Sequence, residues 1–220
     1  MKRVQGSRLT VNAQDDMAVH YDKREGKDHL GGCGSKGDGA TYYPAMWDHM
    51  VEKYNIKSVI DVGCGYGFSS DYFKSLGLKV LGVEGSQGGY DDNFLPKEML
   101  VQHDYERDGS YIPEEEFDLC WCCEFVEHVE ESSMHNFFDT FKKAKYIAMT
   151  FASPGQGGHH HVNEQFGDYW INHIQALGYE VLDDDTQEMR AKARTDCAEF
   201  SPFYESHFIS RGLIFKRKES

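Results

Sequence analysis

The chain has 220 residues and a formal net charge of −14, from 37 acidic and 23 basic residues. Hydrophobic residues make up 40% and aromatic residues 14%, which is enough to bury a core and excludes wholesale disorder. Nucleic-acid binding depends on basic side chains that displace counterions from phosphates, so this acidity argues against a nucleic-acid partner. It argues against an anionic membrane surface for the same reason.

The sequence also lacks the signals of membrane insertion and export. No apolar stretch reaches the roughly 18 residues of a transmembrane helix, and the N-terminal segment MKRVQGSRLTVNAQDD has no apolar core of a signal peptide. Most of the cysteines lie in or beside segments that we expect to be buried strands, which suits reduced thiols. We therefore expect a cytoplasmic protein.

The first part of the chain differs from the rest. Residues 1–43 are polar and glycine-rich without clear periodicity, and we expect an N-terminal arm or lid. Residues 44–220 would form one domain, of a length typical for single domains. The domain begins with AMWDHMVEKY after Pro44, whose apolar residues recur at helical spacing.

From residue 58 onward the pattern alternates between short apolar runs and amphipathic segments. Further helices are predicted over 68–77, 130–144 and 165–177. Strands are predicted over 58–63, 79–85, 99–104, 117–125, 146–153, 179–184 and 206–217. This alternation predicts an α/β fold, a Rossmann-like, mostly parallel sheet with helices on both faces.

The most informative motif is VIDVGCGYGFS, in which a strand leads into a glycine-rich turn and then a helix. Such a turn lets the backbone approach a ligand closely. A G-x-G-x-x-G dinucleotide motif would need glycine at position 68, where this chain has Phe68. Asp61 ends the strand, and its carboxylate is suited to a cationic amino group.

Two further acids follow at successive strand ends. Glu84 comes about 20 residues after the glycine turn, where a carboxylate can accept hydrogen bonds from a ribose diol. Asp104 ends the next strand and can accept a hydrogen bond from an adenine amino group. Each acid alone is equally well explained as a solvated strand-end residue. Together, the three acids favour a nucleoside-containing ligand.

The segments DVGCGYG, VEGS, QHD and FDLCWCCEFVEHV resemble those of class I S-adenosylmethionine-dependent methyltransferases, over about residues 44–182. The resemblance implies a seven-stranded sheet whose last strand is antiparallel, and S-adenosylmethionine as the cofactor. It also implies the cofactor site. Methionine, ribose and adenine would be bound by Asp61, Gly63, Cys64, Gly65, Glu84, Gly85, Ser86, His103 and Asp104, with Glu124 near the sulfonium.

The loop after the expected fifth strand, SPGQGGHHHVNEQFGDYW, departs from the commonest branch of the family. It leaves the carboxyl end of a central strand, where open α/β sheets bind ligands. One of His159, His160 and His161 can act as a general base on an acceptor hydroxyl, bind a metal, or be structural. Adjacent residues of an extended segment point to opposite faces, so three consecutive histidines rarely share one ion, and we predict no metal site.

Two other candidates have both a functional and a structural interpretation. His128 is a second candidate base, and packing against the sheet explains it equally well. Cys120, Cys122 and Cys123 lack C-x-x-C spacing, so we interpret them as small buried hydrophobic residues and not as zinc ligands.

We therefore expect an enzyme that methylates a sugar, glycan or other small polyhydroxyl acceptor on oxygen, with His128, His160 or His161 beside that oxygen. Similar single-domain methyltransferases of phages, large algal viruses and bacterial polysaccharide gene sets carry a comparable histidine-bearing loop, a resemblance that points to glycan methylation. The alternatives are N- or C-methylation of a metabolite, a nicotinamide-dependent oxidoreductase, and a non-catalytic cofactor-binding module. The expected partner is the small-molecule or carbohydrate acceptor, with no nucleic acid and no membrane, and a homodimer is left open.

Overall fold

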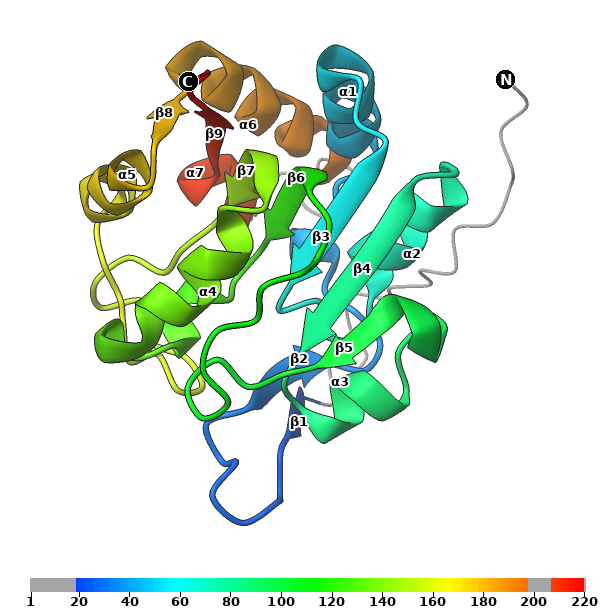
Figure 1. Cartoon of the computed structure of the whole chain (residues 1–220), viewed down its shortest axis with the longest axis vertical. Coiled ribbons are helices and arrows are strands. Elements are labelled where there is room, and N and C mark those ends of the chain that lie inside the picture. The colour runs from blue at the N-terminus through cyan, green and yellow to red at the C-terminus, as the bar shows by residue number, and fades with distance from the viewer. Residues whose placement is uncertain (1–18, 198–206, 220) are drawn as a thin grey trace.

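A computed structural model describes residues 19–197 and 207–219 of the chain. Its centre is a seven-stranded sheet in the order β5-β4-β3-β6-β7-β9-β8 (Figure 1). β9 is antiparallel to both of its neighbours, whereas β3 to β7 pair in parallel. The predicted Rossmann-like fold is therefore confirmed, including the antiparallel last strand. The sheet strands are β3 (Ser58–Val62), β4 (Lys79–Glu84), β5 (Leu100–Gln102), β6 (Phe117–Cys122), β7 (Ala144–Met149), β8 (Tyr179–Val181) and β9 (Leu213–Arg217).

Helices cover both faces of the sheet (Figure 1). On one face pack α1 (Pro44–Tyr54), α2 (Phe68–Ser75), α6 (Asp183–Cys197) and α7 (His207–Arg211). On the other pack α4 (Met134–Phe141) and α5 (Gly167–Ala176). The short helices are α3 (Gln87–Asp91), η1 (Gly39–Thr41), η2 (Lys97–Met99), η3 (Val126–His128) and η4 (Glu131–Ser133).

Successive side chains of β6 point to opposite faces of the sheet and pack against the helices on each face. Cys120 and Cys122 are fully buried on the α4–α5 face, while Leu119 and Trp121 are buried on the α1–α7 face. Burial raises the pKa values of Cys120 and Cys122 well above the usual thiol range, so both thiols stay protonated and inert. Their interpretation as buried hydrophobic residues is confirmed.

The arm contains structure that its sequence does not reveal. β1 (Val19–Tyr21) and β2 (Gly31–Gly34) form an antiparallel hairpin beside α3, at the carboxyl end of the parallel strands (Figure 1). Glycines dominate β2, so no apolar alternation marks it as a strand. Residues 1–18 of the predicted arm lie outside the described residues.

The prediction of one continuous strand over 206–217 is wrong in its first half. Residue 206 lies outside the described part, His207–Arg211 form α7, and only Leu213–Arg217 form a strand. α7 ends where Gly212 N donates to Phe208 O, and a Cβ at Gly212 would lie 2.4 Å from the Phe208 ring. A glycine is therefore needed at the point where the chain leaves the helix and enters the sheet.

Helix α6 was not predicted at all, because its sequence DDDTQEMRAKARTDC has little apolar periodicity. Met189 and Ala193 are its buried apolar side chains in the core against α1. Three aspartates in its first turn favour helix initiation there. The same aspartates argue against the predicted strand end at 183–184.

Among the described residues, no helix is both long and apolar enough to cross a membrane.

Candidate active site

A cleft of about 430 Å³ opens at the carboxyl ends of β3, β4 and β6. Its walls come from the arm, the glycine turn, the strand ends, the segment after β6, the histidine-bearing loop and His207 of α7. This volume lies within the range of roughly 300–1,000 Å³ typical of ligand pockets. Parallel α/β sheets bind ligands at this edge, where the strand order changes direction.

The glycine turn after β3 depends on backbone conformations that other residues rarely adopt. Gly63, Gly65 and Gly67 all have positive φ, at 72°, 55° and 81°. A Cβ at Gly63 would lie 2.5 Å from the ring of Phe125, and a Cβ at Gly65 would lie 3.3 Å from Cys33 of the arm. Side chains at these positions would therefore close the space between the turn, the arm and the segment after β6.

Asp61 projects into this cleft from the end of β3 and is 2% exposed. The hydroxyls of Ser69 and Ser70, in the first turn of α2, each donate to its Oδ2 at 2.6 Å. Burial raises the pKa of Asp61 to about 6, although these two hydrogen bonds act in the opposite direction. Within the described residues Asp61 forms no ion pair, and a buried carboxylate of this kind is suited to bind an ammonium group.

Both carboxylate oxygens of Glu84, at the end of β4, already accept hydrogen bonds from neighbouring residues. Oε2 accepts from Gly65 N at 2.8 Å, and Oε1 accepts from Ser86 N at 2.7 Å and from Ser86 Oγ at 2.6 Å. A carboxylate has about four acceptor positions, so about one is left for a ligand. The predicted pair of hydrogen bonds to a ribose diol would therefore require one of these contacts to give way.

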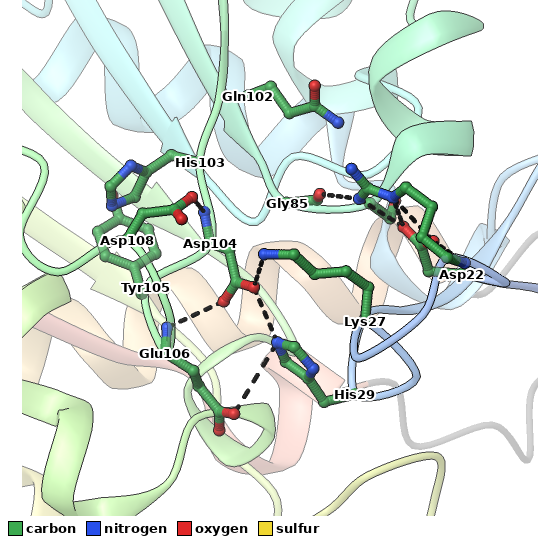
Figure 2. Close-up of polar contacts among 12 residues, drawn as sticks. Asp22, Lys27, His29, Gly85, Gln102, His103, Asp104, Tyr105, Glu106 and Asp108 are labelled. Atoms are coloured by element: carbon green, nitrogen blue, oxygen red, sulfur yellow. Dashed lines mark hydrogen bonds and ion pairs between the residues drawn. The ribbon is translucent and has the colours of Figure 1, made fainter.

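Asp104 connects the sheet to the arm (Figure 2). Its Oδ2 accepts from Lys27 Nζ at 2.5 Å and lies 3.0 Å from His29 Nε2, while its Oδ1 accepts from Glu106 N at 3.0 Å. Burial alone would raise the pKa of Asp104, but the hydrogen bonds from Lys27 and His29 outweigh it and lower the pKa. The carboxylate predicted to bind adenine thus has two partners in the arm.

A second set of contacts attaches the arm to the start of α3 (Figure 2). Asp22 forms an ion pair with Arg24 and accepts from Gln87 N at 2.9 Å, and Arg24 donates to Gly85 O at 3.0 Å. A Cβ at Gly85 would lie 2.8 Å from Leu30 of the arm. The arm therefore packs directly on the strand end that is expected to bind the ribose.

At the opposite end of the cleft, Glu124 forms an ion pair with a residue of α7. Its Oε2 lies 2.6 Å from His207 Nδ1, and His207 Nε2 lies 3.7 Å from Asp38 of the arm. Burial by itself lowers the pKa of His207, but hydrogen bonds to Asp38 and Glu124 raise it to about 9. His207 is therefore a cation at neutral pH that joins α7, the arm and the segment after β6.

The histidine-bearing loop separates its three histidines, as expected for adjacent residues. His159 and His161 line the cleft, whereas His160 lies 3.8 Å from Glu106 and faces the ring of His29. His128 also lines the cleft. Burial, followed by the effect of His161, lowers the pKa of His128 to about 4, so its imidazole is neutral at pH 7 and a weak base.

Nearly all of the predicted site residues gather at this one cleft. The exceptions are Ser86, which caps α3 and supports Glu84, and His160. The predicted cofactor residues that line it are Asp61, Gly63, Cys64, Gly65, Glu84, Gly85, His103, Asp104 and Glu124.

Sequence reasoning missed the residues that reach the site from distant segments. Lys27 and His29 lie in an arm without periodicity, and His207 lies in a segment predicted as a strand. No local pattern identifies such residues. Glu127 was also missed, although its position beside His128, in a segment that the family resemblance covers, was a signal.

The fold and the site together define a class of protein: a Rossmann-like α/β enzyme with an acidic, glycine-lined cleft for a nucleoside-containing cofactor. Residues 60–144 match the family model of a methyltransferase domain. A comparison with the curated proteins found no match.

Solved structures share the fold. The methyltransferase domain of a bacterial Hen1 protein has a TM-score of 0.53 at 17% identity, covering 80% of this chain and 97% of that one. A putative sarcosine dimethylglycine methyltransferase from Galdieria sulphuraria has a TM-score of 0.51 at 13% identity, covering 80% and 85%. The [4+2]-cyclase SpnF has a TM-score of 0.51 at 12% identity, covering 86% and 90%.

The matched segment is a methyltransferase domain, and the sheet and helices around it have the fold of S-adenosylmethionine-dependent methyltransferases. Its cleft fits that cofactor: the buried Asp61 carboxylate suits the ammonium of the methionine part, and the turn at Gly63 and Gly65 leaves room that a Cβ would fill. When bound, S-adenosylmethionine supplies an electrophilic methyl group on a positively charged sulfur.

Proposed function

We propose that this methyltransferase acts on a hydroxyl oxygen of a sugar, a glycan or another small polyhydroxyl compound. The observation that carries the proposal is the composition of the part of the cleft not assigned to the cofactor. Five side chains there can form hydrogen bonds, namely Glu106, His128, Gln156, His159 and His161. Polyhydroxyl compounds need such a wall, because each hydroxyl both donates and accepts hydrogen bonds.

The main task of the chain is to align two reactants. A sulfonium is a good leaving group, so placing the acceptor oxygen in line with the methyl carbon supplies much of the rate enhancement through effective molarity. Asp61 and the glycine turn would fix the methionine part of the donor. The arm, attached through Lys27 and Asp104, would cover the cleft and exclude water.

The histidines then determine the environment of the acceptor oxygen. His128 and His161 both line the cleft, with ring centroids 4.9 Å apart, so contact with the acceptor is assigned to these two. His161 Nδ1 lies 3.0 Å from Glu164, which orients its ring. His160 faces Glu106 and His29, and its proposed part is to support the arm.

The test is methyl transfer from S-adenosylmethionine with a deuterated methyl group to a panel of acceptors. The panel contains monosaccharides, nucleotide sugars and oligosaccharides, together with amine and carbon-acid metabolites. Mass spectrometry should find the label on a hydroxyl oxygen of a carbohydrate, and His161→Asn should slow the transfer at least tenfold. Exclusive labelling of amines or carbon atoms would overturn the proposal.

A further inference from the structure

Glu127, in the short helix η3 after β6, is a fully buried carboxyl group. The residue is 0% exposed, and neither carboxylate oxygen has a hydrogen-bond partner in the described part of the chain. Burying an unpaired carboxylate is costly, so such a group either takes up a proton or binds a cation.

Two imidazoles face this carboxyl group. One ligand atom each of Glu127, His128 and His161 lie within 4.8 Å of one another. The Nδ1 atom of His128 is likewise buried without a hydrogen-bond partner. Backbone hydrogen bonds fix the arrangement, because Val162 N and Asn163 N donate to Glu127 O at 3.0 and 3.1 Å. These bonds hold the loop that carries His161 against η3.

His161 is oriented as metal-binding histidines usually are. Its Nδ1 lies 3.0 Å from Oε1 of Glu164, and Glu164 also accepts from Gly155 N at 2.7 Å and from Gly157 N at 2.6 Å. In metal sites the second ring nitrogen commonly binds a carboxylate in this way, which fixes the ring and makes the other nitrogen a better ligand.

The remaining nitrogen, Nε2, has space only because of a glycine. A Cβ at Gly158 would lie 2.3 Å from His161 Nε2, so any other residue would fill the position beside this atom. The glycine, the oriented imidazole and the unpartnered carboxyl group are three independent features of one small site.

We propose that Glu127, His128 and His161 bind a divalent transition-metal cation in the wall of the cleft, and that this cation coordinates the acceptor oxygen. Two imidazoles and one carboxylate are a donor set for zinc, manganese or iron, and three protein ligands leave positions open for substrate. His128 and His161 line the cleft, so the open positions would face the acceptor. Of the three consecutive histidines, only His161 takes part.

The chemical role of the ion rests on the proposed function, O-methylation. Coordination lowers the pKa of a hydroxyl, so the acceptor releases its proton to water at neutral pH. The oxygen then forms a bond to the methyl carbon, and the carbon–sulfur bond breaks with its electron pair passing to sulfur. The products are the methyl ether and neutral S-adenosylhomocysteine. Neither histidine acts as the base, because both would be ligands of the ion.

The direct test is titration of the EDTA-treated, dialysed full chain with MnCl₂, ZnCl₂ or MgCl₂ in separate calorimetric experiments. We expect one Mn²⁺ or Zn²⁺ ion per chain, with Mg²⁺ at least tenfold weaker because imidazole favours transition metals. Glu127→Gln and His161→Asn should each weaken binding at least tenfold. His135→Asn and Glu98→Gln, at exposed positions, are the matched controls and should bind as the parent does.

Folding is checked by thermal unfolding of each variant without metal. Glu127→Gln removes a buried ionisable group and should not lower Tm, so loss of binding in this variant cannot be attributed to unfolding. Absence of stoichiometric binding of all three ions, or binding that survives both site variants, would overturn the metal site.

Different experimental results would contradict the role of the metal ion and the proposed O-methylation. If a hydroxyl acceptor is methylated at an unchanged rate in excess EDTA, the role of the ion is overturned and O-methylation stands. If the ion binds with the expected ligand dependence but only amines or carbon atoms are methylated, the site stands and O-methylation is wrong.

Discussion

Lys27 Nζ lies 2.5 Å from the Asp104 carboxylate, so a residue of the N-terminal arm neutralises the acid at the end of the third parallel strand. The side chain of Asp104 is 3% exposed and that of Lys27 is 24% exposed, which makes this pair stronger than a surface ion pair. The arm is therefore attached at the place where the adenine of the cofactor is expected.

This attachment predicts that the arm controls release of the cofactor. Lys27→Met should weaken S-adenosylhomocysteine binding by about tenfold, about 1.4 kcal/mol, mainly through faster dissociation. Stopped-flow dissociation measures the rate, and hydrogen exchange over residues 21–34 should increase in the variant. Lys23→Met is the matched control, since Lys23 makes none of these contacts with Asp104. An unchanged dissociation rate in Lys27→Met would contradict the prediction.

Cofactor binding should depend on pH through Asp61. The pKa of this carboxyl group is raised to about 6 by burial, so the group loses its charge as pH falls through 6. If the charged form binds the ammonium of the cofactor, affinity should fall at least tenfold between pH 7.5 and pH 5. Calorimetry across this range measures it. Asp61→Asn should bind weakly at every pH, and an equally steep pH profile in this variant would assign the titration to another group.

The same raised pKa predicts that ionisation of Asp61, which favours cofactor binding, destabilises the folded chain. The Asp61 pKa is 3.8 in the unfolded chain and about 6 in the folded one, so its ionisation destabilises the fold. This loss is absent below pH 3.8 and complete above pH 6, where it amounts to about 3 kcal/mol. Cofactor-free Asp61→Asn should therefore have a Tm at pH 7.5 no lower than the parent chain. A clear decrease in Tm would show that the ionised carboxylate stabilises the fold.

His207 should stabilise the fold in its charged form. His207→Ala removes the partner of Glu124, and we expect a loss of about 1–3 kcal/mol at pH 7, reduced by the partial exposure of both groups. Because the folded pKa of His207 is about 9, against 6.5 for the unfolded state, the contribution is complete below pH 6.5 and is lost as pH rises through 9. Urea unfolding of both proteins at pH 6.5 and pH 10 measures the difference, which should disappear at the higher pH.

The glycine turn provides a stability test that does not depend on ligands. Gly63 has φ of 72°, and a Cβ there would lie 2.5 Å from Phe125. Gly63→Ala should therefore destabilise the chain by about 1–3 kcal/mol through backbone strain and the clash. Gly109 also has positive φ, but a Cβ there would have no atom within 4 Å, so Gly109→Ala measures the backbone strain alone. Equal losses in thermal unfolding of the two variants would show that Phe125 moves away at no cost.

The sequence by itself determined the parallel sheet and the cofactor end of the cleft. Both are encoded locally: buried strands are continuous apolar runs, and Asp61, Glu84 and Asp104 occupy strand ends at positions that the parallel pairing brings to one edge. The helix at 44–54 was likewise evident from its apolar spacing. The helix α6 and the strand β2 were not evident, because β2 consists mainly of glycine and α6 buries few apolar side chains, so periodicity gives little signal.

Only the tertiary structure decided what lies around these acids. Lys27 is 77 residues from Asp104, and His207 is 83 residues from Glu124, so no local pattern can pair them. The grouping of Glu127 and His128 with His161, more than 30 residues away, depends on backbone hydrogen bonds between η3 and the histidine-bearing loop. Local sequence fixes conformation through periodicity and backbone restriction, whereas contacts between distant side chains exist only after the sheet has brought their loops to one edge.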